Sequence, residues 1–344
     1  MRENLNEKKA SEFNLYFNNV LYKDQLMQGW LSVNSVADTV HAQILLNEEC
    51  ASLGTACAAA KMRLDKKTPE SFRNSFQAYR GPKSFPDYFE RKWLSLRLNA
   101  VKRGLVLNGD VTPETIQQIT GEYCPVSLTR FTLSGQHPSN PSIDRLYNDG
   151  TYAVANLVVV TQRVNRAKAD KSFEEIFELA LSEQDSDGLT AIEWARLTCL
   201  MYGAWNAYNG DRDPYLIPLS TYPSHRIFTS ESQVVQLLLL KLCTDRNIGT
   251  GSARWLDATR KSGQAEKLFQ DFMVQLNKAV EEEEFAPSAW LRTDLFRSFA
   301  EWYMLSKPAI TAMLQQLHLK FQREVSHQQL INTWAVGERN KANK

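Results

Sequence analysis

Apolar side chains recur at helical spacing along most of this chain. In the first 80 residues, apolar positions between Val33 and Leu45 repeat every three or four residues, and Ala51–Met62 is rich in alanine. Capping-box pairs precede several later apolar stretches: Ser172 with Glu175, Thr190 with Glu193, and Ser230 with Gln233. Apolar residues at helical spacing, preceded by a capping box, predict amphipathic or buried helices. We therefore predict a mainly helical (mainly α) protein.

The pattern changes in the middle of the chain. Pro141–Leu146 predicts a short extended segment, because proline disfavours helix before it and apolar positions follow. Asn148-Asp149-Gly150 has the composition of a turn. Leu157–Val160 is the strongest strand signal, since it is continuous and β-branched, and Gln162–Lys168 is rich in straight-chain residues that favour a helix. The predicted order is strand, turn, strand, helix: a small α+β centre inserted among helices.

Two proline-containing segments predict further helix starts. Thr68-Pro69-Glu70 predicts an N-cap threonine followed by a proline at the first helical position. Ser306-Lys307-Pro308 predicts the start of another helix, through about Phe321. The aromatic segment before it, from Trp290 to Tyr303, predicts core packing, with a partner-binding face as the alternative.

The predicted elements define four regions. Residues 1–80 form an N-terminal helical region, and residues 81–182 combine a basic helix with the strand–turn–strand–helix centre. Residues 188–336 form a C-terminal helical domain, and the charged tail 337–344 is expected to be disordered. Gly81-Pro82 and Ser186-Asp187-Gly188 mark the boundaries on either side of the centre.

Composition excludes several classes of protein. The 344 residues are 43% hydrophobic, as in globular proteins, and the formal net charge of +1 means that any nucleic-acid surface must be local. The five cysteines are scattered and odd in number, which favours a reducing compartment over a disulfide framework. No apolar stretch reaches about 18 residues, and the N-terminal residues lack an apolar signal region. We therefore predict a cytoplasmic protein without a membrane span.

A local excess of positive charge precedes the centre. From Arg80 to Arg103 the sequence has seven Lys and Arg residues against two acidic residues, on a predicted helix with Leu94, Leu98 and Val101 on its apolar side. A DNA backbone is the partner such a surface suits, with salt-sensitive affinity; a solvated charged face is the alternative. The candidate nucleic-acid-binding residues lie before and after the centre: Arg91, Arg97, Lys102, Arg103, Arg163, Arg166 and Lys168.

The centre also holds candidate metal ligands. Asp144 lies at the end of the first predicted strand, and Asn165 lies in the helix that follows the second. In a small ββα unit these two side chains can converge on one hard cation, because carboxylate and amide oxygens suit Mg²⁺ or Mn²⁺. A phosphodiester bound there would be polarised by the metal and held by the surrounding positive side chains.

These residues resemble the HNH, or ββα-metal, endonucleases. The similarity is closest to a phage and bacterial branch whose core contains S-[IL]-D-R-[IL]-D, then G-Y, then an Asn before an apolar strand, then N-x-x-K. The chain has, in this order, SIDRL from Ser142, GTY from Gly150, ANLVVV from Ala155 and NRAK from Asn165. The upstream segments WLSLR, RGL, TPE and CPV also fit, so the resemblance covers about residues 88–181. Several short motifs in one order are more specific than any of them alone.

The resemblance implies a ββα-metal fold and metal-dependent cleavage of DNA. Asp144 and Asn165 would bind the Mg²⁺ or Mn²⁺ ion. Asn156 would hold the loop between the strands through backbone hydrogen bonds. Arg145 would grip the scissile phosphate or stabilise the charge that develops on it.

The chain also departs from the branch. Arg145 occupies the position where most HNH enzymes have the histidine that acts as general base, and a guanidinium cannot accept a proton. Tyr147 replaces an aspartate, and Leu128 replaces a glycine. His137, in an upstream loop, is the candidate base, and a solvated loop histidine is the alternative. No CxxC pair surrounds the centre, so no structural zinc is expected.

Two classes of function remain open. The first is a metal-dependent DNA endonuclease or nickase, of the kind that serves mobile elements or phage defence. The second is a catalytically inactive HNH-like module, acting as a DNA-binding or protein-interaction scaffold with a protein partner on the C-terminal helical domain. An open site shared by Asp144 and Asn165 would favour the nuclease. A packed aromatic or an ion pair of Arg145 in that space would favour the scaffold.

Overall fold

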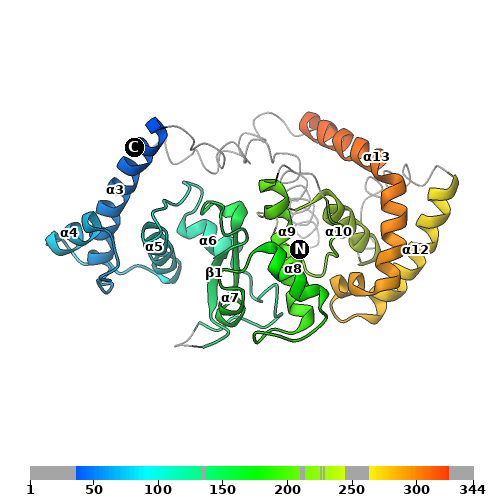
Figure 1. The fold of residues 1–344 in the computed structure, drawn as a ribbon, viewed down its shortest axis with the longest axis horizontal. Coiled ribbons are helices and arrows are strands. Elements are labelled where there is room, and N and C mark those ends of the chain that lie inside the picture. The colour runs from blue at the N-terminus through cyan, green and yellow to red at the C-terminus, as the bar shows by residue number, and fades with distance from the viewer. Residues whose placement is uncertain are drawn as a thin grey trace. The chain divides into compact units, whose positions relative to one another are not determined.

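The computed structural model describes residues 36–133, 137–209, 214–224, 227, 229–244 and 263–324. These residues are mainly helical and include one two-stranded antiparallel sheet (Figure 1). The chain divides into two compact units. The first, here called the ββα unit, comprises Asp24–Cys124 and Thr129–Asn165, and the second, the helical unit, comprises Met1–Lys23, Pro125–Leu128 and Arg166–Lys344.

The ββα unit begins with two helices that lie side by side, α3 (Val36–Ala59) and α4 (Glu70–Ala78) (Figure 1). The described parts of the two predicted apolar stretches lie in the single helix α3, except for the last residues up to Met62, which follow its end at Ala59. Gly54 lets the helices approach closely, because a Cβ atom there would overlap the carbonyl oxygen of Phe72. The predicted cap of α4 is wrong by one residue. Pro69 is the N-cap, and Thr68 instead donates to the carbonyl oxygen of Asp65 at 2.6 Å.

Helix α5 (Tyr88–Val101) joins two apolar cores within the ββα unit. Asp87 and Glu90 form its capping box. On one side, Leu94 and Val101 pack with the core of α3 and α4. On another side, Leu96 and Ala100 pack with the sheet and with α6 (Pro113–Ile119), which begins at a capping box formed by Thr112 and Thr115.

The central order of strand, turn, strand and helix is confirmed. Strand β1 (Pro141–Arg145) pairs with β2 (Leu157–Thr161) in antiparallel register, so that Pro141 lies opposite Thr161 and Arg145 opposite Leu157. A short 3-10 turn, η1 (Val154–Asn156), leads into β2. Helix α7 (Gln162–Lys168) follows β2 with no intervening loop. The continuous apolar run of β2 is buried along its whole length.

The helical unit contains α8 (Phe173–Leu181), α9 (Ala191–Tyr208) and α10 (Glu231–Thr244). The three predicted capping boxes are confirmed by reciprocal hydrogen bonds. The backbone nitrogens of Glu175, Glu193 and Gln233 each donate to the cap hydroxyl, and each of these side chains accepts from the cap nitrogen.

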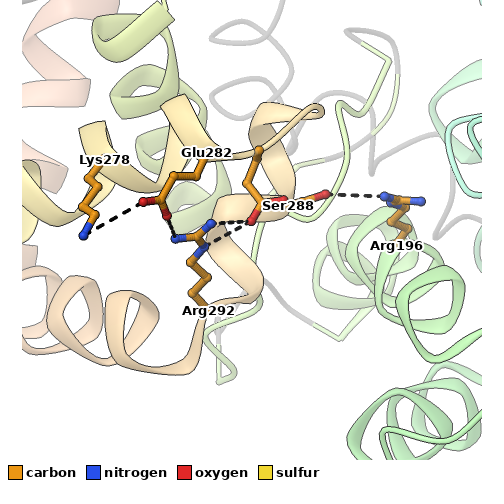
Figure 2. Close-up of polar contacts among 6 residues, drawn as sticks. Arg196, Lys278, Glu282, Ser288 and Arg292 are labelled. Carbon is orange, nitrogen blue, oxygen red and sulfur yellow. Dashed lines mark hydrogen bonds and ion pairs between the residues drawn. The ribbon is translucent and has the colours of Figure 1, made fainter.

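The rest of the helical unit has an aromatic core. It contains α12 (Gly263–Glu282), the 3-10 turn η2 (Ala286–Leu291) and α13 (Thr293–Glu324). The predicted burial of the aromatic segment is confirmed, since Trp290, Phe299, Trp302 and Tyr303 are fully buried. At the end of α12, Arg292 forms an ion pair with Glu282 (Figure 2). It forms a second ion pair with Glu283.

The predicted helix start at Ser306 is wrong, because α13 runs through it with Pro308 in its interior. An interior proline removes a hydrogen bond to the carbonyl four residues earlier. That residue is Met304, which is 63% exposed. The charged tail 337–344, expected to be disordered, lies outside the described residues.

Candidate metal centre in the ββα unit

The two faces of β1 have different chemistry. Successive strand residues point to opposite faces, so Ser142 and Asp144 share one face and Ile143 and Arg145 share the other. Ile143 packs against the apolar core of the ββα unit. Asp144 lies opposite Val158 and is half-buried. The carboxylate predicted as a metal ligand is therefore on the strand face away from this core.

Helix α7 brings the second predicted ligand to the same face. The Nδ2 atom of Asn165 donates a hydrogen bond of 2.6 Å to the Oγ atom of Ser142. Ser142 precedes Asp144 by two residues, a separation of about 6.6 Å along a strand. The side chains of Asn165 and Asp144 thus lie on one face of the sheet, and their sharing of a cation remains a prediction.

The donor set on this face fits a hard cation. It offers one carboxylate and one amide oxygen, and Mg²⁺ is commonly bound by one or two protein groups while it keeps several waters. Among the described residues, no three His, Cys, Asp or Glu side chains cluster in a way that could hold a metal ion. A metal here would therefore have few protein ligands, Asp144 and Asn165, and would complete its coordination with water or substrate oxygens.

Asn156 organises the loop between the strands. Its side chain is fully buried, and its Oδ1 accepts from the backbone nitrogen of Tyr147 at 2.8 Å. Its Nδ2 donates to the carbonyl oxygens of Tyr147 and Thr151, each at 3.0 Å. These are backbone hydrogen bonds of the kind expected of this residue. They connect Asn156, at the end of the loop, to Tyr147 near its start and to Thr151 in its middle, and they leave its amide no direct part in chemistry.

The side chain of Arg145 contacts the loop between β1 and β2. It is 8% exposed, and its guanidinium donates to the carbonyl oxygen of Gly150 at 3.0 Å. It also stacks over the ring of Tyr152 at 4.6 Å, while Arg103 donates to the hydroxyl of that tyrosine at 3.1 Å. Arg145 lies on the strand face opposite Asp144, so this geometry braces the loop and does not present the guanidinium to a phosphate beside Asp144.

His137, the candidate base, lies in an exposed loop. Its Nδ1 accepts a hydrogen bond of 3.2 Å from the backbone nitrogen of Ser139, and lies 3.2 Å from the hydroxyl of Thr132. In this arrangement Nδ1 is occupied by contacts within its own loop, so a role as general base through this nitrogen would require the loop to rearrange.

Two of the predicted nucleic-acid contacts have partners inside the ββα unit. Arg97 makes a two-pronged ion pair with Glu49, at 2.7 and 2.9 Å, and stacks on Trp93 at 4.4 Å. Lys102 pairs with Asp65, and this hydrogen bond lowers the pKa of the Asp65 carboxyl. Both basic side chains therefore stabilise the packing of α5 on its neighbours.

The other predicted contacts differ in exposure. Lys168 is 1% exposed, which does not fit a contact with DNA. Arg163 is half-buried, and Arg91, Arg103 and Arg166 are exposed. The exposed arginines are the ones that still suit a phosphate backbone, and their role remains a prediction.

A short hairpin stands at the position of the CPV motif. Cys124 and Thr129 are joined by a backbone hydrogen bond of 2.9 Å, and the Sγ atom of Cys124 accepts from the backbone nitrogen of Thr161 at 3.4 Å. Leu128, where the resembling branch has glycine, adopts a left-handed conformation with φ of 54°. Glycine adopts that conformation without steric cost, so the backbone retains the shape for which a glycine is suited.

The side chains that flank this hairpin loop come from the helical unit. Thr221 donates to the carbonyl oxygen of Pro125 at 2.6 Å, and Arg196 donates to that of Val126 at 3.2 Å. Arg196 also reaches the hydroxyl of Ser288 at 3.5 Å (Figure 2). These contacts join residues far apart in the chain and were not predicted.

The cysteines do not form a nucleophilic site. All five are free, and burial raises the pKa of Cys57 and Cys199 to about 11 and that of Cys243 to about 12. The thiolate is the reactive form, so thiols with such pKa values are poor nucleophiles near neutral pH.

Two groups beside the site were not predicted to act there. Alternation along β1 places Ser142 on the face of Asp144. The Nζ atom of Lys92 donates to the carbonyl oxygen of Pro141 at 2.8 Å and so fixes the start of β1. Burial lowers the pKa of this lysine.

In the described part of the chain, no helix has the length and apolar content needed to cross a membrane. Comparisons with known protein families, curated proteins and solved structures yield no match. The interpretation of the site therefore rests on its residues and their geometry.

Proposed function

We propose that this protein is a metal-dependent DNA endonuclease or nickase of HNH type, serving a mobile element or phage defence. The observation that carries the proposal is the contact of Asn165 with Ser142, which brings the asparagine of α7 to the strand face that holds Asp144. A carboxylate and an amide oxygen on one face, at the junction of two strands and a helix, form a donor set for Mg²⁺ or Mn²⁺.

In this proposal, Asp144 and Asn165 hold the cation, which when bound polarises a phosphodiester and lowers the pKa of a coordinated water. Asn156 and Arg145 act indirectly. Asn156 ties the loop after β1 to the start of β2, and Arg145 braces that loop against Tyr152. With Arg145 so placed, the proton of the attacking water must go to solvent, or to a histidine such as His137 after the loop moves.

The proposed substrate is DNA bound through its phosphates. The exposed arginines Arg91 and Arg103 belong to the ββα unit, and Arg166 is exposed on α7. With a net charge of +1 for the whole chain, few phosphate contacts are expected. The affinity should therefore fall with salt, with a shallow dependence set by that small number of contacts.

Cleavage of supercoiled plasmid tests the proposal. Wild-type protein with Mg²⁺ or Mn²⁺ should convert the plasmid to nicked or linear form, and a chelator should stop the reaction. Asp144→Ala and Asn165→Ala should each reduce the rate by about 100-fold or more, since even groups that only orient metal ligands cost about 10- to 100-fold. Asp170→Ala and Asn99→Ala remove the same side-chain types at exposed positions and should cleave at the wild-type rate.

Equal cleavage by wild type and Asp144→Ala would assign the activity to a contaminant or another site. Absence of cleavage with either metal would reject the nuclease.

One observation favours a second candidate, a catalytically inactive HNH-like module that acts as a scaffold. Arg145 occupies the position of the usual histidine base and is buried against the aromatic ring of Tyr152. A module of this kind would bind DNA without cutting it. A mobility-shift assay beside the plasmid assay separates the two, because retained binding with no cleavage supports the scaffold.

A further inference from the structure

An asparagine can act as a metal ligand through only one end of its amide. The Oδ1 atom has lone pairs, whereas the Nδ2 group is a donor and repels a cation. Rotation of the amide by half a turn exchanges the two ends, and the torsion that controls this rotation has a broad, nearly two-fold profile. A site that uses Asn165 therefore needs some other group to choose the end that faces the cation.

In the structure, Ser142 holds the amide in one of these two orientations. Its Oγ atom accepts the 2.6 Å hydrogen bond from Nδ2 of Asn165, and it lies on the strand face that Asp144 shares. With Nδ2 committed to Ser142, Oδ1 is the end of the amide that can act as a ligand.

Other hydrogen bonds already attach α7 to the chain before β1. The backbone nitrogen of Gln162 donates to the carbonyl oxygen of Asn140 at 2.9 Å, and that of Arg163 donates to Pro138 at 3.1 Å. Strand β2, which leads directly into α7, is paired with β1 along five positions. The fold at this junction does not depend on the bond between Ser142 and Asn165, so that bond acts mainly on the orientation of the amide.

We propose that Ser142 is a positioning residue for the metal centre, which holds the Asn165 amide with its oxygen directed toward the cation bound by Asp144. The inference rests on the proposed function, because it assigns a role within that same site. Groups that orient metal ligands typically change metal affinity by about 10- to 100-fold when they are removed.

The test compares Ser142→Ala with Ser142→Thr. The alanine variant removes the hydroxyl, whereas threonine keeps it and suits a strand. Binding of Mn²⁺ is followed by electron paramagnetic resonance, the Mg²⁺ concentration for half-maximal plasmid nicking is measured in parallel, and the thermal midpoint is recorded without metal. Ser142→Ala should weaken Mn²⁺ binding about 10- to 100-fold and raise the Mg²⁺ requirement, with the midpoint unchanged. Ser142→Thr should recover most of the affinity.

The possible failures are distinct. If Ser142→Ala binds Mn²⁺ and requires Mg²⁺ as wild type does, the positioning role is overturned while the nuclease stands. If both variants lose binding together with thermal stability, Ser142 has a structural role only, and the inference is overturned. If wild type neither binds Mn²⁺ nor nicks plasmid, the metal centre itself is absent and both proposals are overturned.

Discussion

The ββα centre and the aromatic core of the helical unit are held together by different kinds of contact. In the centre, buried side chains such as Asn156 and Arg145 are fixed by hydrogen bonds to backbone atoms. In the helical unit, the rings of Phe269, Phe272 and Trp302 pack with centroids 5.1–5.3 Å apart. Hydrogen bonds are directional, whereas apolar burial is not.

The difference indicates where the chemistry of the molecule lies. Directional bonds are what a site needs to orient a ligand or a metal, because each one fixes a side chain in one direction. Apolar packing contributes most of the stability but specifies no reacting atom. We therefore expect substitutions in the aromatic core to change stability alone, and substitutions in the centre to change activity beyond their effect on stability.

The largest effect on stability should come from the aromatic core. Trp302→Ala removes a fully buried ring and should lower the free energy of unfolding by about 3–5 kcal/mol. Trp302→Phe should cost much less, because Nε1 of Trp302 has no hydrogen-bond partner among the described residues to be lost. Urea denaturation followed by far-ultraviolet circular dichroism measures both. A cost for Phe as large as that for Ala would contradict the packing account.

Asn156→Ala should have the next largest effect and should act on the site as well. It leaves backbone groups of Tyr147 and Thr151 without their buried partner, which should cost about 2–4 kcal/mol. Nicking per folded molecule should also fall, because the loop after Asp144 is no longer fixed. Asn99→Ala, at an exposed position on α5, is the matched control and should change neither quantity.

A smaller effect should appear at Leu128, which has a positive φ. Glycine relieves that strain and alanine does not, so Leu128→Gly should be more stable than Leu128→Ala by about 1 kcal/mol. Leu133 is 68% exposed and provides the matched pair. There, alanine should be at least as stable as glycine, so the same order of stability at both positions would contradict the conformational account.

The smallest effect concerns pH. The hydrogen bond from Lys102 lowers the pKa of Asp65 in the folded state, so this pair stabilises the protein above the ordinary carboxyl pKa of about 3.9. The contribution is lost as the pH falls through the lowered pKa. The thermal midpoint should therefore fall less in Asp65→Asn than in wild type when the pH is lowered from about 5 to about 3. Asp170→Asn, at an exposed position, is the control.

The sequence predicted those features that depend on neighbouring residues. Capping boxes at Ser172, Thr190 and Ser230 and the strand at Leu157 are local, and the structure has them. Partners far along the chain could not be predicted. Arg97 faces Glu49 from 48 positions away, so local charge alone made Arg97 look available to DNA. Pro308 was predicted to stand at a helix start, but α13 runs through it. Whether a helix continues through a proline depends on its tertiary surroundings, which local sequence does not show.

The positions of Asp144 at the end of β1 and of Asn165 in α7 could be predicted because both lie close to recognisable strands and turns. The one error that the pattern could have prevented concerns Arg145. Alternation along β1 places Arg145 opposite the face of Asp144, so the two could not readily act on one phosphate. The stacking partner of Arg145, Tyr152, lies beyond a turn and could be located only in the structure.

Binding of Mn²⁺ to wild type and to Asp144→Asn, measured by electron paramagnetic resonance, tests the central claim most directly. The substitution keeps the size of the side chain and removes its charge. We predict saturable binding to wild type and affinity at least about 10-fold weaker in the variant, with thermal midpoints in the absence of metal nearly equal. Equal affinity of the two proteins, or no binding to wild type, would contradict a cation site at Asp144.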